Sequence, residues 1–401
     1  MVIVGGYKKY LELSQLEQLV RERNFDVNCL LKQYAFQNKP LDFDSAYLLG
    51  AFTLASYVSE LREIFPGSPE LILRQSIAAL CSFHNRATYI QERSGEQIAG
   101  ICAAVFDYDI RTSEYGFIVV DGSENIMDNC GMGGDLYRTP NLSTIAALIA
   151  AANGIPMFKH GSPGNTDNVG SSDFLAYCGV ELFPSKNIPK EGIKQLSFGY
   201  TDALDIRYKR IHLQTHQQAK LAHMNDIIGP ITNPLHPKLM KRRVVGINHL
   251  IPPERVAEAY KILNEKQITA VEKALFVRGF STPERNGGID EISIMPGGTI
   301  VAELNHGEIR TYNLYARDFD LEEISASELD PGSNKAQTSL SILKGELEDS
   351  RTNATLANAA ILFYLAKGIS FREGTALARK TLLSGKPYEL LRAYAKLSKE
   401  V

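Results

Sequence analysis

Residues 129–173 read NCGMGGDLYRTPNLSTIAALIAAANGIPMFKHGSPGNTDNVGSSD. Two glycine-containing loops, at 131–135 and 159–161, lie on either side of an apolar stretch that predicts a short helix. Each loop follows an apolar run that predicts a strand, 117–120 for the first and 155–158 for the second. A strand, a glycine-rich turn, a helix and a second strand form one βαβ unit. Ligands of such units usually bind at the carboxyl ends of the strands, which is where both loops lie.

The first loop suits a phosphate. Gly131, Gly133 and Gly134 have no Cβ, so their backbone N–H groups can approach an anion closely. Asp135 does not fit a pure anion site, because a carboxylate binds sugar hydroxyls or a metal ion better. The glycine-rich loop therefore predicts a phosphorylated ligand that also carries hydroxyls or a metal.

The start of the predicted helix and the second loop add polar groups to the same place. Asn141, Ser143 and Thr144 fall where the helix begins, so they can cap it or donate to a bound oxygen beside its partial positive charge. Lys159 and His160 add donors at the second strand end. A single Ser or Asn at a helix start is most often only a cap.

A second group of chemical interest is the acidic pair Asp290 and Glu291, just after the glycine-rich loop RGFSTPERNGG at 278–288. Adjacent carboxylates on an irregular segment can turn toward one cavity, where their oxygens would suit Mg²⁺. Taken alone, such a pair is more often a solvated surface feature.

Composition excludes several classes. The chain has 401 residues and a net charge of −3, with no basic excess to suggest general nucleic-acid binding. No apolar run approaches the roughly 18 residues of a membrane span, and the N-terminus lacks a signal-peptide pattern. Five scattered cysteines without metal-ligand spacing predict reduced thiols in a cytoplasmic protein. Among them, Cys130 is expected to fill the core rather than act as a nucleophile.

The order of predicted elements indicates an α/β fold with a small all-helical lobe. We expect an N-terminal helical extension at 1–40, a helical lobe at 41–115, and an α/β domain at 116–204 and 241–401. From Tyr115 strands and helices alternate, which favours a mostly parallel central sheet flanked by helices. Further predicted strands lie at 180–183, 243–247 and 274–277, with a hairpin over 299–314. Predicted helices include 14–20, 44–61, 209–228, 354–366, 371–383 and 388–397.

The joint pattern GMGGD, TPNLST, KHG and GSSD resembles the anthranilate phosphoribosyltransferase family of nucleoside phosphorylase-like glycosyltransferases. That family's loops read GTGGD, TFNIST, KHGN and SGSAD. Two further segments match, GPITNP at 229–234 and GIDEIS at 288–293. The resemblance covers roughly residues 40–401, and it implies that about 205–240 returns to the helical lobe.

The resemblance implies Mg²⁺-dependent transfer of a phosphoribosyl group from 5-phosphoribosyl 1-pyrophosphate (PRPP) to an aromatic amine, as in tryptophan biosynthesis, with release of pyrophosphate. It needs no catalytic nucleophile, and the family's helical lobe implies a homodimer. The implied PRPP-binding residues are Gly131, Gly133, Gly134, Asp135, Asn141, Ser143, Thr144, Lys159, Gly161 and Ser171. The implied metal ligands are Ser143, Asp290 and Glu291.

The acceptor side departs from the family pattern. Ser162 and Pro163 replace the family's Asn and Arg after KHG, and Asn168 replaces a loop lysine. Counting back from GPITNP puts His216 where the family has an arginine that pairs with the anthranilate carboxylate. A histidine cannot replace the guanidinium fork. We expect acceptor contacts from His160, Ser162 and His216, with anthranilate bound differently or another acceptor used.

Two other functions stay open from the sequence. A non-catalytic relative could bind nucleic acid or a nucleotide, although the only dense basic cluster, 238–243, reads more easily as a solvated turn. A phosphorolytic nucleoside enzyme on the same fold is a weaker alternative. His212 and His216 have the i, i+4 spacing of a zinc pair, but no third ligand is evident.

Overall fold

The computed structural model describes residues 7–110, 116–122, 125–164, 169–202, 211 and 213–400. The chain divides into two compact units. A helical unit comprises Met1–Phe117, Ala203–Lys238 and Leu250–Ala270, and an α/β unit comprises Ile118–Asp202, Leu239–His249 and Val271–Val401. Residues 250–270 thus belong to the helical unit rather than to the α/β domain, because helix α13 (Pro253–Glu265) packs on helix α7 (Ser94–Tyr108).

The helical unit is built around the close pair of α7 and α3 (Phe43–Leu54). Gly100 of α7 faces the backbone of Phe43, so a Cβ at position 100 would overlap α3. Besides α3, α7 and α13, the described helices of this unit are α1 (Leu13–Glu22), α2 (Val27–Gln33), η1 (Ala35–Gln37), α4 (Ser59–Ile64), α5 (Pro69–Ser82), α6 (Arg86–Tyr89), the π-helical η4 (Leu213–Gln218) and α12 (Asn225–Ile231).

A buried carboxylate ties the N-terminal segment to this pair. Asp107 of α7 accepts hydrogen bonds from the hydroxyls of Tyr7 at 2.8 Å and Tyr47 at 2.5 Å, and from the amide of Tyr10 at 3.0 Å. Residues 7–40 are therefore grouped with the helical unit.

Three helix predictions in this unit were wrong in detail. Glu12 caps α1, two residues before the expected Ser14. The predicted helix at 44–61 breaks into α3 and α4 at residues 55–58. The predicted helix at 209–228 is interrupted between η4 and α12, while 203–210 and His212 lie outside the described residues. Ser68 caps α5 before a proline at the first helical position.

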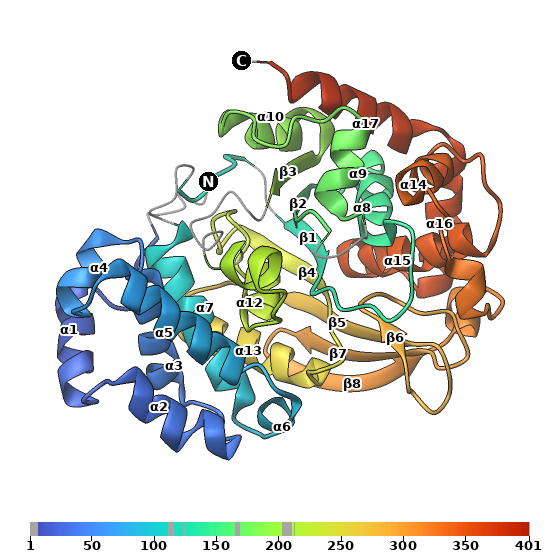
Figure 1. Cartoon of the computed structure of the whole chain (residues 1–401). Helices are drawn as coiled ribbons and strands as arrows, with labels where there is room; N and C mark the ends of the chain where they lie inside the picture. The colour runs from blue at the N-terminus through green and yellow to red at the C-terminus, as the bar shows by residue number, and fades with distance from the viewer. Residues whose placement is uncertain are drawn as a thin grey trace. The chain divides into compact units, whose positions relative to one another are not determined.

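The α/β unit contains an eight-stranded sheet among the described residues, in the order β3-β2-β1-β4-β5-β7-β8, with β6 paired to β5 (Figure 1). The strands are β1 (Ile126–Gly131), β2 (Met157–Gly161), β3 (Phe198–Asp202), β4 (Met240–Gly246), β5 (Lys273–Phe280), β6 (Gly288–Ile289), β7 (Thr299–Asn305) and β8 (Glu308–Leu314). Strands β1 to β5 run parallel, and β6, β7 and β8 pair antiparallel. The mostly parallel sheet of an α/β fold is confirmed.

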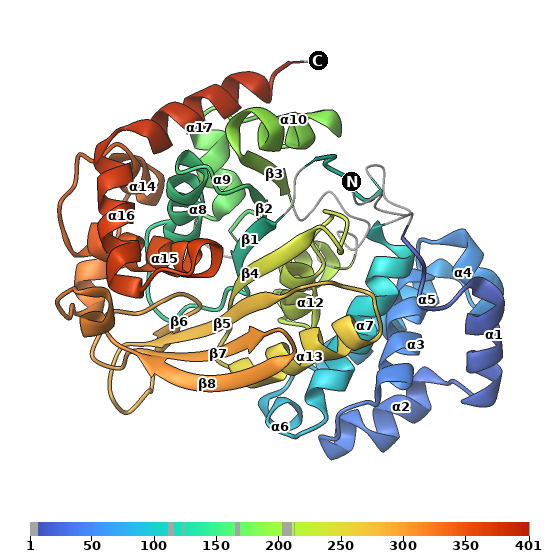
Figure 2. The same cartoon turned by 180° about the vertical axis from the view of Figure 1, so that it is seen from behind.

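Helices α8 (Leu142–Ala152), α15 (Ser350–Lys367) and α16 (Phe371–Leu383) gather on one side of this sheet (Figures 1 and 2). After Ser143 and Thr144 the side chains of α8 are all apolar and almost all buried, as expected for a helix packed between other helices and the sheet. The unit also contains α9 (Ser171–Tyr177), α10 (Asn187–Leu196), α14 (Lys335–Leu343), α17 (Lys386–Leu397), η5 (Ala316–Phe319) and η6 (Ala326–Leu329).

Two strand predictions were wrong. Residues 117–120 contain only a single bridge at Ile118, and β1 begins at Ile126 after a turn at 121–122. Residues 180–183 are irregular, while β3 was not predicted. The strands β4 and β5, the hairpin that turns after Asn305 and the three C-terminal helices are confirmed. Gly368 ends α15 in the left-handed region.

None of the described helices is by itself long and apolar enough to cross a membrane; only the bent pair α15 and α16 meets the length and composition criteria together.

Candidate active site

The site begins at the point where the strand order reverses. Strand β1 pairs with β2 on one side and with β4 on the other, and the carboxyl ends of β1 and β4 lie together. Gly131 ends β1 and Gly246 ends β4, and a Cβ at either glycine would overlap Asp290. Open parallel sheets bind ligands at such reversals of strand order. The two glycines thus leave room for an acidic residue at that position.

The glycine-rich loop and the acidic segment are joined by hydrogen bonds. The amide of Gly133 donates to Oδ2 of Asp290 at 2.6 Å, and the amide of Asp290 donates to Oδ1 of Asp135 at 2.6 Å. Leu136 donates to the carbonyl of Gly288 at 3.1 Å. Gly133 and Gly134 have φ of +74° and +86°, which glycine adopts without strain. The structure therefore brings together the two segments that the sequence placed 155 residues apart.

Helix α8 starts beside the second carboxylate. The amide of Ser143 donates to Oε1 of Glu291 at 3.2 Å, and Asn129 donates to the carbonyl of Ser143 at 2.8 Å. Asn358 of α15 holds the next residue, because its Oδ1 accepts from the amide of Ile292 at 3.0 Å. Glu291 is thus fixed between the first turn of α8 and a core helix.

These carboxylates repel one another. Burial, followed by the charge of Asp290, raises the pKa of Glu291 to about 8, and the same two causes raise the pKa of Asp135 well above its usual range. The ammonium of Lys159 and hydrogen bonds from Ser143 oppose the shift of Glu291. A group of acids whose charges are this costly has the chemistry of a cation site.

The donor set fits a magnesium ion. Among the described residues no three His, Cys, Asp or Glu side chains could hold a metal ion by themselves. Mg²⁺ does not need such a cage, because it keeps waters and takes one or two carboxylates together with substrate phosphates. Asp290, Glu291 and Ser143 are the residues that could hold it.

The other expected phosphate-side residues lie around the start of α8 and of α9. Asn141 Nδ2 donates to the carbonyl of Gly170 at 3.0 Å, and Thr144 Oγ1 donates to Ser171 Oγ at 3.0 Å. A Cβ at Gly161 would crowd Ser171, which explains the glycine at the end of β2. The hydrogen bonds thus connect the start of α8 to the start of α9.

Lys159 is almost completely buried at the same sheet edge. Its exposed fraction is 1%, and its Nζ donates to the carbonyl of Asn129 at 2.8 Å. Its charge acts on Glu291 from within the sheet.

On the expected acceptor side, His160 is buried and neutral. Its Nδ1 lies 3.1 Å from Thr201 Oγ1, while its Nε2 has no partner among the described residues. Burial lowers the pKa of His160 to about 4, so the ring carries no charge at neutral pH. Ser162 is half-buried, and its backbone carbonyl accepts a hydrogen bond from the amide of Ser172 at 3.2 Å. His216 lies in η4 of the helical unit, but its side chain and Asn168 are outside the described residues.

Sequence reasoning missed a residue that ties down the loop after β2. One oxygen of Asp173, Oδ2, accepts from the amides of both Gly164 and Gly170 at 2.8 Å. Asp173 thereby holds the two ends of the loop together, next to Ser171. The available signal was the final Asp of GSSD, at the third position of a helix that follows a glycine.

A buried ion pair behind the site was also missed. Arg243, on β4, donates to Oδ2 of Asp128 on β1 at 2.5 Å, with exposed fractions of 2% and 0%. The interpretation of 238–243 as a solvated turn was therefore wrong for its end, because Arg243 points into the sheet. Cys130 lies beside this pair, and burial raises the pKa of its thiol to about 12, in agreement with a core role.

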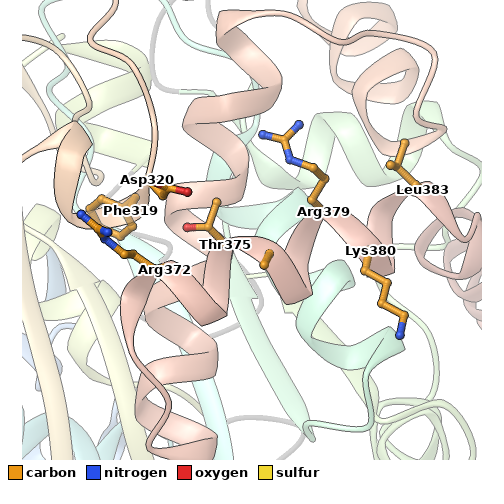
Figure 3. A pocket seen from close by; sticks show the side chains of 8 residues that line it. Phe319, Asp320, Arg372, Thr375, Arg379, Lys380 and Leu383 are labelled. Atoms are coloured by element: carbon orange, nitrogen blue, oxygen red, sulfur yellow. The ribbon is translucent and has the colours of Figure 1, made fainter.

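A separate cavity of about 350 Å³ lies on α16 (Figure 3). It is lined by Phe319, Asp320, Arg372, Thr375, Ala376, Arg379, Lys380 and Leu383. None of these residues belongs to the candidate site, which is defined by the contacts at the sheet edge.

Known proteins resemble this chain along most of its length. Residues 123–388 match the model of the glycosyl transferase family, a/b domain. The anthranilate phosphoribosyltransferase of Shewanella sp. (strain ANA-3) is 34% identical over 311 residues, which cover 76% of this chain and 84% of that protein.

Solved structures agree. Anthranilate phosphoribosyltransferase from Thermus thermophilus is 25% identical, with a TM-score of 0.72 over 94% of this chain and all of that one. The enzyme from Saccharomyces cerevisiae in complex with PRPP and Mg is 19% identical, and its TM-score of 0.68 over 98% of this chain and 99% of that one shows the same fold. With this fold, this degree of identity and the glycine-rich loop joined to the acidic pair, the chain is a phosphoribosyltransferase that belongs to the anthranilate phosphoribosyltransferase family.

Proposed function

We propose that this enzyme transfers the phosphoribosyl group of PRPP to the nitrogen of anthranilate or a related aromatic amine, with Mg²⁺, and releases pyrophosphate. The observation that carries the proposal is the hydrogen bond from Gly133 to Asp290, which joins the glycine-rich loop to the acidic pair. A ligand that is at once a polyanion and a magnesium chelator suits both. Further support comes from the yeast relative solved with PRPP and Mg.

The diphosphate of PRPP would lie between the glycine-rich loop and the acidic pair. The amides of Gly134 and Asp135 have no hydrogen-bond partner among the described residues, so they are available to phosphate oxygens. The carboxylates of Asp290 and Glu291 would repel a bare diphosphate, and this repulsion is the reason to propose a metal between them. When bound, magnesium neutralises the charge that grows on the leaving diphosphate.

The rest of the substrate would lie along the start of α8 and α9. Asn141, Thr144 and Ser171 would orient the ribose and its 5-phosphate, with Lys159 adding positive charge from within the sheet. The bond between C1 and the diphosphate oxygen breaks while the acceptor nitrogen attacks C1 from the opposite face. The nitrogen then loses a proton. Catalysis would come from positioning and electrostatic stabilisation, without a covalent bond to the protein.

The proposed acceptor is an aromatic amine. If it carries a carboxylate, no charged side chain at His160, Ser162 or Pro163 would hold that group. His160 is neutral at working pH, and Ser162 and Pro163 carry no charge. These three positions would thus offer hydrogen bonds to the acceptor but no guanidinium fork.

The test is an assay of pyrophosphate release with PRPP and Mg²⁺. Anthranilate is compared with aniline, which lacks the carboxylate, and with benzoate, which lacks the amine. We expect release with anthranilate or aniline and none with benzoate. Comparable rates with anthranilate and aniline would show that the carboxylate is not recognised. No release with any amine, together with no heat of PRPP binding, would refute the proposal.

We also propose a homodimer formed through the helical unit, in line with the family resemblance. Light scattering behind a sizing column should give twice the 44.4 kDa chain mass at micromolar concentration. A mass of one chain at that concentration would contradict the dimer and leave the transferase proposal untouched.

A further inference from the structure

Helix α14 begins with a lysine whose charge interacts with the carboxylates of the candidate site. Lys335 is its first residue, and the side chain of Asn334 caps the helix by accepting from the amide of Gln337 at 3.0 Å. The preceding turn is tied down as well. Gly332 donates to Asp330 Oδ1 at 2.7 Å, and Thr338 Oγ1 donates to the carbonyl of Pro331 at 2.7 Å. The backbone on both sides of Lys335 is therefore held in place.

The same helix is bound to the expected PRPP-binding residues. Ser339, one turn after Lys335, accepts from the amide of Asn141 at 3.0 Å and donates to its Oδ1 at 3.0 Å. Since Asn141 precedes the first turn of α8, this double hydrogen bond fixes the start of α14 beside the start of α8. Lys335 is thus positioned by the same contacts that position the candidate site.

The ammonium of Lys335 has no partner among the described residues. It is half-buried, and none of them forms a hydrogen bond or an ion pair with it. Burial lowers the pKa of Lys335, while the charges of Asp135, Asp290 and Glu291 oppose that shift. The ammonium is therefore close enough to sense all three carboxylates but bonds to none of them.

The nearby cations differ from Lys335 in this respect. Lys159 donates its Nζ to a backbone carbonyl, and Arg138 is bound to the carbonyl of Gly332 at 2.7 Å. An ammonium that bonds to none of three nearby carboxylates can bind a small anionic ligand that reaches the same place. A diphosphate can accept from the ammonium with one phosphate while the other faces the acidic pair.

We propose that Lys335 is a PRPP-binding residue whose ammonium donates to the diphosphate group of the substrate. The inference rests on the proposed function, because it takes PRPP as the ligand. It assigns to α14 a role that no motif in the sequence indicated. Lys335 would also hold the pyrophosphate product, since the same group leaves.

The experiment compares Lys335→Gln with Lys335→Arg and with Lys380→Gln, which removes the same charge from an exposed position on α16. The readouts are the KM for PRPP, the KM for the acceptor, the dissociation constant of pyrophosphate measured calorimetrically with Mg²⁺, and the melting temperature. Loss of one charged hydrogen bond should weaken PRPP and pyrophosphate roughly 10- to 100-fold. The acceptor KM should change less than about twofold, and Lys335→Arg should recover part of the loss.

Three results would overturn the inference. First, Lys335→Gln and Lys380→Gln could bind pyrophosphate with equal affinity, although the wild type binds PRPP. That result would show that Lys335 does not contact the diphosphate. Equal losses for PRPP and acceptor, with a lower melting temperature, would show a structural role. If the wild-type protein bound neither PRPP nor pyrophosphate, the proposed function would fail too, and this outcome is distinguishable because it is seen before any substitution.

Discussion

The amide of Gly133 donates a hydrogen bond of 2.6 Å to Oδ2 of Asp290, and 157 residues of sequence separate the two. A carboxylate that accepts a hydrogen bond from a backbone amide with one oxygen is held in one orientation, and its second oxygen can still bind a ligand. Because Asp290 is also backed by the glycines that end β1 and β4, its position is set by the sheet and not by the flexibility of a loop.

Gly131→Ala should therefore abolish most activity. A Cβ at position 131 would overlap the Asp290 carboxylate, which must then move and disturb the acidic pair. We expect a fall in kcat/KM of roughly 100-fold or more, since misplacing a catalytic group by about 1 Å has that effect. Gly307→Ala in the β7–β8 turn is the control: its φ of +89° should make alanine lower the stability, but a Cβ there meets nothing within 4 Å, so kcat/KM should stay near that of the wild type. Near wild-type kcat/KM for Gly131→Ala would contradict the assigned role of Asp290.

Glu291→Gln should lower activity without lowering the stability of the metal-free protein. Because its pKa is raised to about 8, the wild-type residue already disfavours its charge, and a neutral amide relieves repulsion with Asp290. We expect an unchanged or higher melting temperature without Mg²⁺ and a loss of rate of roughly 100-fold or more. Rate against Mg²⁺ concentration and thermal melts measure both effects. A strongly lowered metal-free melting temperature would show that Glu291 has a mainly structural role.

The sequence predicted the segments of this site, and the family resemblance implied that they share a ligand, but the direct hydrogen bonds between them were not predicted. The glycine loop, the start of α8 and the acidic pair could be recognised because each is marked by residue types that are adjacent in the sequence. The hairpin was predicted for the same reason, since Gly307 supplies a φ of +89° in its turn.

Elements that depend on distant partners were not predictable. Strand β1 contains Asp128 and Asn129, which interrupt its apolar run. The charge of Asp128 is compensated there by Arg243 on β4. Lys335 was overlooked for a similar reason. Its environment is created by carboxylates that lie far from it in the sequence, and nothing in residues 330–343 indicates them.

His160 should make stability depend on pH. Its folded-state pKa of about 4 lies below the ordinary value of 6.5, so between pH 4 and 6.5 the unfolded chain binds a proton at this residue and the folded protein does not. The neutral ring therefore contributes up to about 3 kcal/mol to the free energy of unfolding. This contribution is complete above about pH 6.5 and is lost as the pH falls toward 4. His160→Asn should flatten the change in unfolding free energy between about pH 7 and 5, measured with denaturant. Equal slopes for both proteins would contradict this shift.

The thiols should differ in reactivity. Cys29 is exposed, whereas Cys130 is buried and the pKa of its thiol is raised to about 12. Iodoacetamide at about pH 8 should label Cys29 within minutes and leave Cys130 unlabelled until the protein is denatured, as read by peptide mass spectrometry. Labelling of native Cys130 at the rate of Cys29 would show that β1 opens readily.

Breaking the ion pair between Asp128 and Arg243 should lower the stability of the folded protein. Asp128→Asn removes the carboxylate that accepts from the guanidinium of Arg243, which is 2% exposed, and should destabilise the protein by about 3–5 kcal/mol. Replacing both partners, as Asp128→Leu with Arg243→Met, removes the buried positive charge as well and should recover most of the loss. Denaturant midpoints of the single variant, the double variant and the wild type measure this difference.

If the double variant were as unstable as Asp128→Asn, the ion pair itself, rather than the avoidance of an isolated buried charge, would stabilise the junction of β1 and β4. The amide of His160 also donates to Asp128, at 3.4 Å. Because leucine cannot accept that hydrogen bond, the double variant should still show a smaller loss of stability at this contact.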